Sequence, residues 1–148
     1  RVVDRGVSDP NNMGAAMAPA AADTLIAHFR DTGRTPADYD RVITGDLGLV
    51  GSRILRELME KNDFPLADDH YMDCGLTIFD PKEDVHAGGS GCGCSASVLS
   101  AHILPRLQKG EWRRVLFMAT GALLSPTTNQ QGETIPGVAH AVVLEGGS

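Results

Sequence analysis

The chain has 148 residues, of which 42% are hydrophobic and 22% charged, and these fractions are ordinary for one globular domain. Its net charge of −6 and its scattered Lys and Arg residues argue against a nucleic-acid-binding surface. Residues 85–105 are uncharged, but the first half of this run is rich in glycine and serine, so no membrane span is predicted. Three cysteines, with Cys92 and Cys94 too close to pair, do not indicate a disulfide framework and favour a reducing compartment.

Hydrophobic periodicity predicts alternating helices and strands after a loop-like segment at residues 4–13. The chain begins Arg1-Val2-Val3 without an initiator Met or signal peptide, which we interpret as a fragment starting at or just after a strand. The first helix is expected to hold Pro19 in its first turn and to end at Gly33. We expect helices over 14–31, 50–61 and 94–108, a short turn at 35–39, and strands at 41–44, 76–79, 115–119 and 138–144.

This order of elements predicts an α/β fold with right-handed crossovers. The run at 115–119 is continuously apolar, which is typical of a strand in a sheet that is covered on both faces. Residues 62–75 are acidic and read as irregular, and 121–137 read as a loop. Pro105 can kink the third helix.

The main candidate for a functional site is the stretch Gly88-Gly89-Ser90-Gly91-Cys92-Gly93-Cys94-Ser95 at the predicted start of the third helix. It can be a tight turn without a ligand, or a pocket in which helix N–H groups bind an anion or a polarised oxygen. It lacks the Gly-Lys-Ser/Thr of a Walker loop. Cys92 or Cys94 at a helix N-terminus would have a lowered pKa and could be reactive, but no His partner stands at a recognisable spacing.

A metal site is a further alternative for the same stretch. His70, Cys74, Cys92 and Cys94 offer the ligand types of zinc, yet only the spacing of His70 and Cys74 suits a structural site. His140, in the last predicted strand, could be aimed at the glycine-rich stretch or could be a histidine of the core.

The chain resembles the C-terminal half of the stage V sporulation protein AD family, thiolase-like proteins of spore-forming bacteria. The most specific stretches lie at 9–15, 28–35, 44–48, 88–95, 119–126, 135–136 and 139–140. The resemblance implies a thiolase-like fold in which two α/β halves stack as helix, sheet, helix, sheet, helix. Residues 1–148 would form one half, a C-terminal thiolase-like domain. Its third helix would lie between the two sheets, and the N-terminal half with the nucleophile position is absent.

Condensing enzymes of this fold carry a Gly-His-x-x-Gly motif, and its closest match here places Gly89, Ser90 and Gly93 on the Gly, His and Gly positions. Serine offers no usable base at neutral pH. The loop at 44–46 lacks the His of related enzymes, and 135–137 lacks their Cys. The resemblance therefore implies a binding protein rather than an enzyme. The alternative is a thiolase-superfamily acyltransferase that uses a Cys of the absent half.

The resemblance also implies the ligand and its setting. The ligand would be dipicolinic acid, free or as its calcium complex, during uptake into the developing spore, with no cofactor and no metal held by the protein itself. The expected partners are other proteins of the same operon, which would hold the chain peripherally at the spore inner membrane, and a second copy in a homodimer. The predicted ligand-binding residues are Gly89, Ser90, Gly91, Cys92, Gly93, Ser95 and His140.

Overall fold

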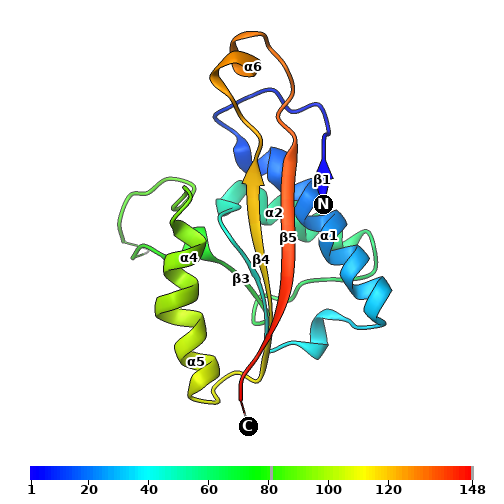
Figure 1. Cartoon of the computed structure of the whole chain (residues 1–148), viewed down its shortest axis with the longest axis vertical. Coiled ribbons are helices and arrows are strands. Elements are labelled where there is room, and N and C mark those ends of the chain that lie inside the picture. The colour runs from blue at the N-terminus through cyan, green and yellow to red at the C-terminus, as the bar shows by residue number, and fades with distance from the viewer. Residues whose placement is uncertain (81, 148) are drawn as a thin grey trace.

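The computed structural model describes residues 1–80 and 82–147, and in this part of the chain it shows one mixed sheet (Figure 1). The strand order is β1-β5-β4-β2-β3. Strands β2, β3 and β4 are parallel, whereas β5 runs antiparallel to both β4 and β1. The strand bounds are β1 (Val2–Val3), β2 (Arg41–Thr44), β3 (Tyr71–Asp73), β4 (Arg114–Ala122) and β5 (Gly137–Glu145). The predicted α/β class is confirmed.

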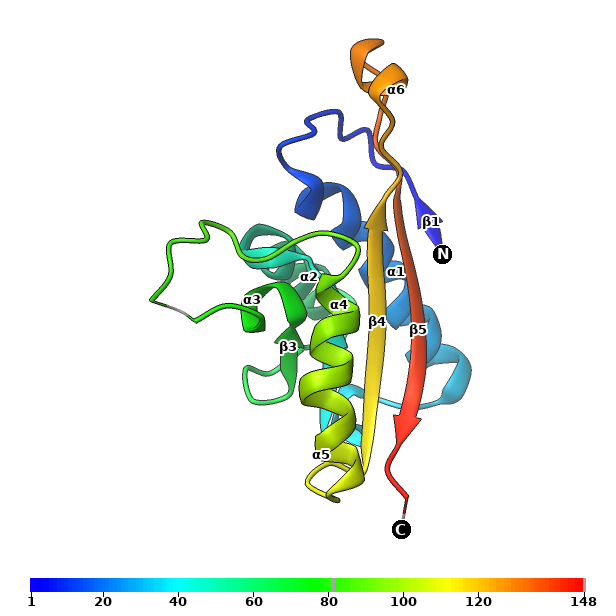
Figure 2. The same ribbon diagram turned by 60° about the vertical axis from the view of Figure 1, so that its left-hand side comes forward.

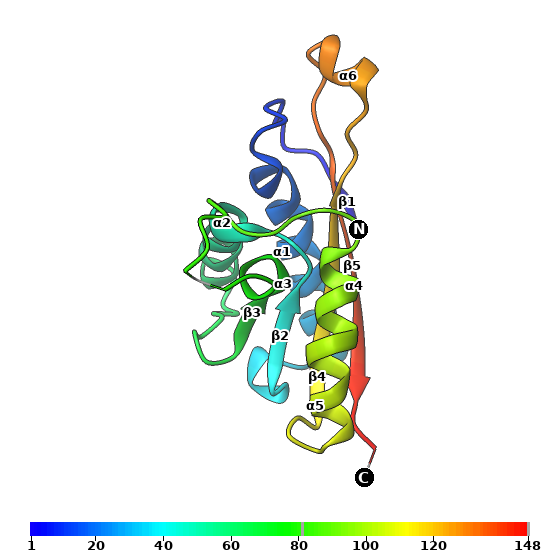
Figure 3. The ribbon, with the colours of Figure 1, turned by 90° about the vertical axis from the view of Figure 1, so that its left-hand side faces the viewer.

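Helices cover both faces of this sheet (Figures 2 and 3). The helices are α1 (Met13–Thr32), η1 (Pro36–Asp38), α2 (Gly48–Glu60), α3 (Cys74–Thr77), α4 (Cys94–Val98), η2 (Leu99–Ile103), α5 (Leu104–Gln108) and α6 (Pro126–Gln130). Helices α1 and α2 pack on one face, and the continuous run α4-η2-α5 packs on the other. No helix among the described residues is long and apolar enough to cross a bilayer.

Two cores result from the alternation of side chains along the central strands. Val42, Leu116 and Met118 point to the side of α1 and α2. Ile43, Val115 and Phe117 point to the side of α4, η2 and α5. The apolar run in β4 is therefore continuous because each of its faces is buried under a different helix layer.

Helix α1 comes close to β5 where its buried face carries a run of alanines. Ala18, Ala20 and Ala21 are fully buried, and a Cβ added at Gly137 of β5 would overlap the carbonyl of Ala16. The helix spans Met13–Thr32, within one residue of the expected 14–31, and Gly33 ends it as expected, but Pro19 lies in its second turn rather than its first.

The third predicted helix contains an irregularity that periodicity does not reveal. Its middle, η2, is a π-helical segment placed just before Pro105. Proline has no N–H to donate, and its ring crowds the carbonyl four residues earlier, so a wider turn accommodates it. The helix thus changes its winding over Leu99–Ile103, directly before the α-helical segment that contains Pro105.

The prediction of a strand at 76–79 is wrong. Cys74–Thr77 form the short helix α3, and the edge strand β3 is formed instead by Tyr71–Asp73, which pair with β2. Tyr71 and Asp73 lie in the segment predicted to be irregular. The loop predicted at 121–137 also contains a short helix, α6, which Ser125 caps by accepting from the N–H of Thr128.

Candidate functional site

The glycine-rich stretch lies at the carboxyl ends of the parallel strands β2 and β4. Cys94 Sγ lies 3.8 Å from the carbonyl oxygen of Gly45, the residue that follows β2. A Cβ on Gly45 would lie within 3.4 Å of both Thr120 of β4 and Ser95 of α4, so the three segments meet here. Ligand sites in open α/β sheets favour this edge, because loops and helix N-termini converge on it.

Asp46 links this stretch to the sheet. Thr120 Oγ1 donates to Asp46 Oδ1 at 2.9 Å, and the N–H of Gly91 donates to Asp46 Oδ2 at 3.3 Å. The N–H of Asp46 in turn donates to Thr120 Oγ1 at 3.2 Å. One N–H of the glycine-rich stretch is therefore occupied by a carboxylate of the protein itself.

Asp46 was not among the predicted site residues. The signal that could have found it is its place directly beyond the carboxyl end of a buried strand, at the edge that the glycine-rich stretch also reaches. The sequence prediction considered this loop only for a missing histidine.

The inner edge of the stretch is tightly packed. The N–H of Gly89 donates to the carbonyl of Gly75 at 2.6 Å. A Cβ on Gly89 would lie 2.5 Å from the Ile78 side chain, and one on Gly75 would lie 2.5 Å from the oxygen of Gly89. Gly89 is therefore needed for packing against α3 and backs the site from inside.

The outer edge is open. A Cβ on Gly91 or on Gly93 would meet no atom within 4 Å. Ser90, Gly91, Cys92 and Gly93 are exposed, and Ser95 is half-buried. These predicted residues are brought together on one open rim at the start of α4.

His140 comes from β5 and not from the glycine-rich stretch. It is exposed, and it pairs with Ala119 of β4, next to Thr120. Its neighbour Ala139 is buried on the α1 side, so strand alternation places His140 on the sheet face that carries α4. The alternative of a core histidine is excluded by its exposure.

Cys94 and Cys74 do not behave as activated thiols. Cys94 and Cys74 are buried, and burial raises the pKa of the Cys94 thiol, which corrects the predicted lowering. Burial, with Asp73 adding to it, raises the pKa of Cys74 to about 12. Cys92 is exposed on the rim. Among residues 1–80 and 82–147 no three His, Cys, Asp or Glu residues gather to hold a metal, so the four suggested zinc ligands do not form a cluster.

A buried polar network supports the loop that carries Asp46. Asp73, at the end of β3, accepts from Thr44 Oγ1 at 2.6 Å and from the N–H groups of Leu47 and Gly48 at 2.9 and 3.0 Å. Burial raises the pKa of Asp73, although these three donors act in the opposite direction. The network fixes the backbone at 47–48 and so sets where Asp46 meets Gly91.

Comparisons with known proteins extend this description. A family model described as stage V sporulation protein AD matches residues 1–145. The chain is 53% identical over 145 residues to a protein of that name from Bacillus subtilis (strain 168). The matched region covers 98% of this chain and 43% of that relative, so the chain spans less than half of the relative's length.

Proposed function

The chain belongs to the stage V sporulation protein AD family, and from that premise we propose that it binds dipicolinic acid, free or as the calcium complex, for uptake into the developing spore. The binding site is the rim formed by Ser90, Gly91, Cys92, Gly93 and Ser95. Dipicolinate is a flat dianion, and backbone N–H groups with serine hydroxyls near a helix start suit such a ligand.

The observation that carries this proposal is the contrast between the two edges of the stretch. Gly75 and Gly89 have no room for a side chain, whereas Gly91 and Gly93 face open space. The backbone is thus held firmly from inside and is approachable from outside, and a planar ligand can come close to it.

Asp46 supports the calcium complex over the free dianion. Its carboxylate lies at the N–H of Gly91 and would repel a second negative group placed there. Calcium prefers carboxylate oxygens, so a calcium ion bound to dipicolinate would turn this repulsion into attraction.

Binding without covalent chemistry is part of the proposal. The resemblance to condensing enzymes places Ser90 at the position of their histidine, and Cys94 is buried with a raised pKa. The partners would be proteins of the same operon and a second copy of the chain, with a peripheral place at the spore inner membrane. The alternative remains an acyltransferase whose nucleophilic Cys lies in an N-terminal half.

Calorimetric titration with dipicolinate, with and without one equivalent of calcium chloride, tests the proposal. Gly93→Val should weaken binding at least about tenfold, a change of about 1.4 kcal/mol, by filling the open side of the rim. Gly147→Val is the matched control, because Gly147 also has open space and no positive φ. Unchanged binding by Gly93→Val would place the pocket elsewhere, and hydrolysis of an acyl-CoA would favour the acyltransferase.

A further inference from the structure

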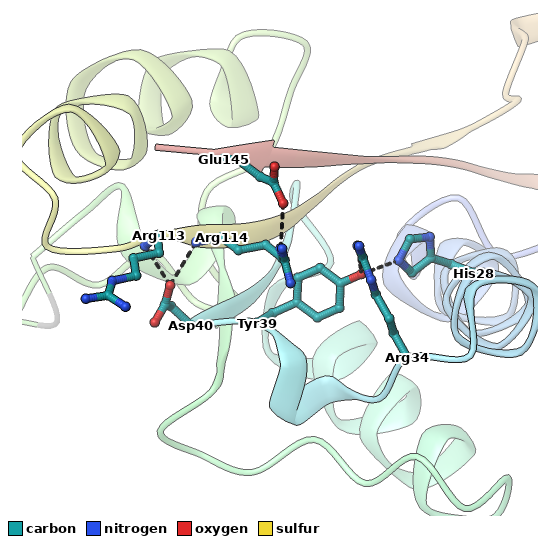
Figure 4. Close-up of polar contacts among 7 residues, drawn as sticks. All are labelled: His28, Arg34, Tyr39, Asp40, Arg113, Arg114 and Glu145. Carbon is teal, nitrogen blue, oxygen red and sulfur yellow. Dashed lines mark hydrogen bonds and ion pairs between the residues drawn. The ribbon is translucent and has the colours of Figure 1, made fainter. Parts of the chain in front are cut away.

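A second polar region lies at the opposite end of the sheet from the glycine-rich stretch, where β2 and β4 begin and β5 ends (Figure 4). It is a hollow of about 570 Å³, and the charged side chains that line it include Asp40, Arg41, Arg113, Arg114 and Glu145. We call it the arginine groove. Nothing in the proposed function uses it.

The carboxylates of the groove already have partners within the chain. Asp40 Oδ2 accepts from the N–H groups of Arg113 and Arg114 at 2.7 and 2.9 Å. Glu145 Oε1 accepts from Arg114 Nε at 2.6 Å. Asp38 accepts from the N–H of Thr35 at 2.7 Å. These carboxylates therefore stabilise the fold through hydrogen bonds within the chain.

The guanidinium groups of the groove keep donors to spare. Arg41 donates from one nitrogen to the carbonyl of Asp40 at 2.6 Å, and its charge lies 5.4 Å from the ring centre of Trp112. Stacking on an aromatic ring holds an arginine ready for a planar acid. The Arg113 side chain is exposed and points away from the other labelled residues (Figure 4).

A neighbouring hollow extends the groove. Its volume is about 470 Å³, it is lined by Gly110 and Trp112, and it shares Arg113 and Gly146 with the first hollow. Arg113 therefore stands between two adjoining hollows. Such a shape fits an elongated ligand better than a compact one.

We propose that the arginine groove binds an extended acidic segment of a partner polypeptide, whose carboxylates pair with Arg41 and Arg113. The pairing of Glu145 with Arg114 in the same groove is an example of this contact. An anionic bilayer fits less well, because a broad flat surface does not enter two adjoining hollows as an extended segment does. A single oxyanion would leave one hollow empty.

Trp112 is the sole tryptophan in the sequence, so its emission reports on this groove. We expect hexaglutamate to change that emission saturably at low ionic strength, with calorimetry as a second measure. Arg113→Gln should weaken binding about fivefold, the effect of one ion pair at a solvated site. Glu145→Gln should strengthen binding, because it releases Arg114 and removes a negative charge. Arg53→Gln, an exposed arginine on α2, should have no effect.

Several results would overturn the proposal. These are no saturable binding of hexaglutamate by either measure, equal losses in Arg113→Gln and Arg53→Gln, or unchanged binding in Glu145→Gln. Binding of phosphatidylglycerol vesicles without binding of the peptide would assign the groove to a membrane. Inorganic phosphate binding as tightly as hexaglutamate would assign it to a small oxyanion. Because the groove lies at the other end of the sheet, none of these results depends on dipicolinate binding.

Discussion

At the scale of single residues, Asp73 shows how a buried acid can serve a site without belonging to its surface. It is only 2% exposed, and each of its carboxylate oxygens accepts from a different part of the loop beyond β2. A carboxylate is needed because both oxygens face donors. The residue is thus a positioning residue for Asp46.

Asp73→Asn should therefore destabilise the chain by about 1–3 kcal/mol, although it removes a buried charge. The amide keeps one acceptor, but its NH₂ group then faces a backbone donor that cannot reverse, the N–H of Leu47 or of Gly48. Urea unfolding measures the loss. Asp31→Asn, at an exposed acid of α1, provides the comparison. If Asp73→Asn were as stable as the unaltered chain, the network would not need both carboxylate oxygens as acceptors.

Asp40 makes a prediction about pH. The N–H of Arg114 above all, with that of Arg113, holds the pKa of Asp40 below its ordinary value of 3.8. A lowered folded-state pKa means that the stabilisation is fully present above pH 3.8 and is lost as the pH falls through the folded value. Asp40→Asn should lower the free energy of unfolding at neutral pH. Below about pH 4, this variant should lose less stability on acidification than the unaltered chain loses. Parallel acid unfolding curves for Asp40→Asn and the unaltered chain would contradict this.

At the scale of elements, α1 depends on the small size of its buried face. Ala21→Leu should cost about 1–3 kcal/mol, because the fully buried alanine leaves no space for added methylenes against the sheet. Ala27→Leu on the same helix is the control, since Ala27 is only half-buried. Thermal or urea unfolding would measure both. A similar cost for the two variants would show that α1 does not approach the sheet as described.

The sequence predicted the long elements well because their signals are local. Helices α1 and α2 and strands β2, β4 and β5 follow from periodicity and from Gly33. Strand β3 could not be predicted, because Tyr71–Asp73 are extended only through pairing with β2, and Asp73 disfavours a strand in isolation. The β-branched and aromatic residues at 76–79 carried a misleading signal, which the contact of α3 with Gly89 overrode.

The site was predictable in part. The glycine-rich stretch was identified because its composition is unusual, but sequence alone could not separate its packed inner edge from its open outer edge. Asp46 lies 45 positions from Gly91, so only the folded chain shows that they touch. The raised pKa of Cys94 could not be predicted from sequence either, because it is caused by burial, and that burial exists only in the folded chain.

At the scale of the whole molecule, the outward face of α4, η2 and α5 carries the small exposed side chains Ala96, Ser97, Ser100 and Ala101, together with the exposed Leu104. The thiolase-like fold that the family resemblance implies would place a second sheet over this face. Ala101→Arg should then change the stability of the present chain by no more than about 0.5 kcal/mol. In a protein that also carries the N-terminal half, it should be strongly destabilising.

Gln108→Arg, at the exposed end of the same helical run, is the control in both proteins. Unfolding measurements on the four variants compare the two settings. Equal tolerance of Ala101→Arg in both would place this helix on the surface and contradict the layered arrangement.

The two carboxylates that flank β2 have a joint consequence for folding. Asp40 binds the backbone at the start of β4, and Asp46 binds Thr120 towards its end. A slip of β2 by one residue along β4 would move both acids about 3.3 Å from their partners and exchange the faces of Val42 and Ile43. A sheet with this wrong register would thus lose the hydrogen bonds of Asp40 and Asp46 and, at the same time, the packing of β2 in both cores. With four residues, β2 is too short to define its own alignment, and the acids at its two ends make the native alignment the one that the chain retains.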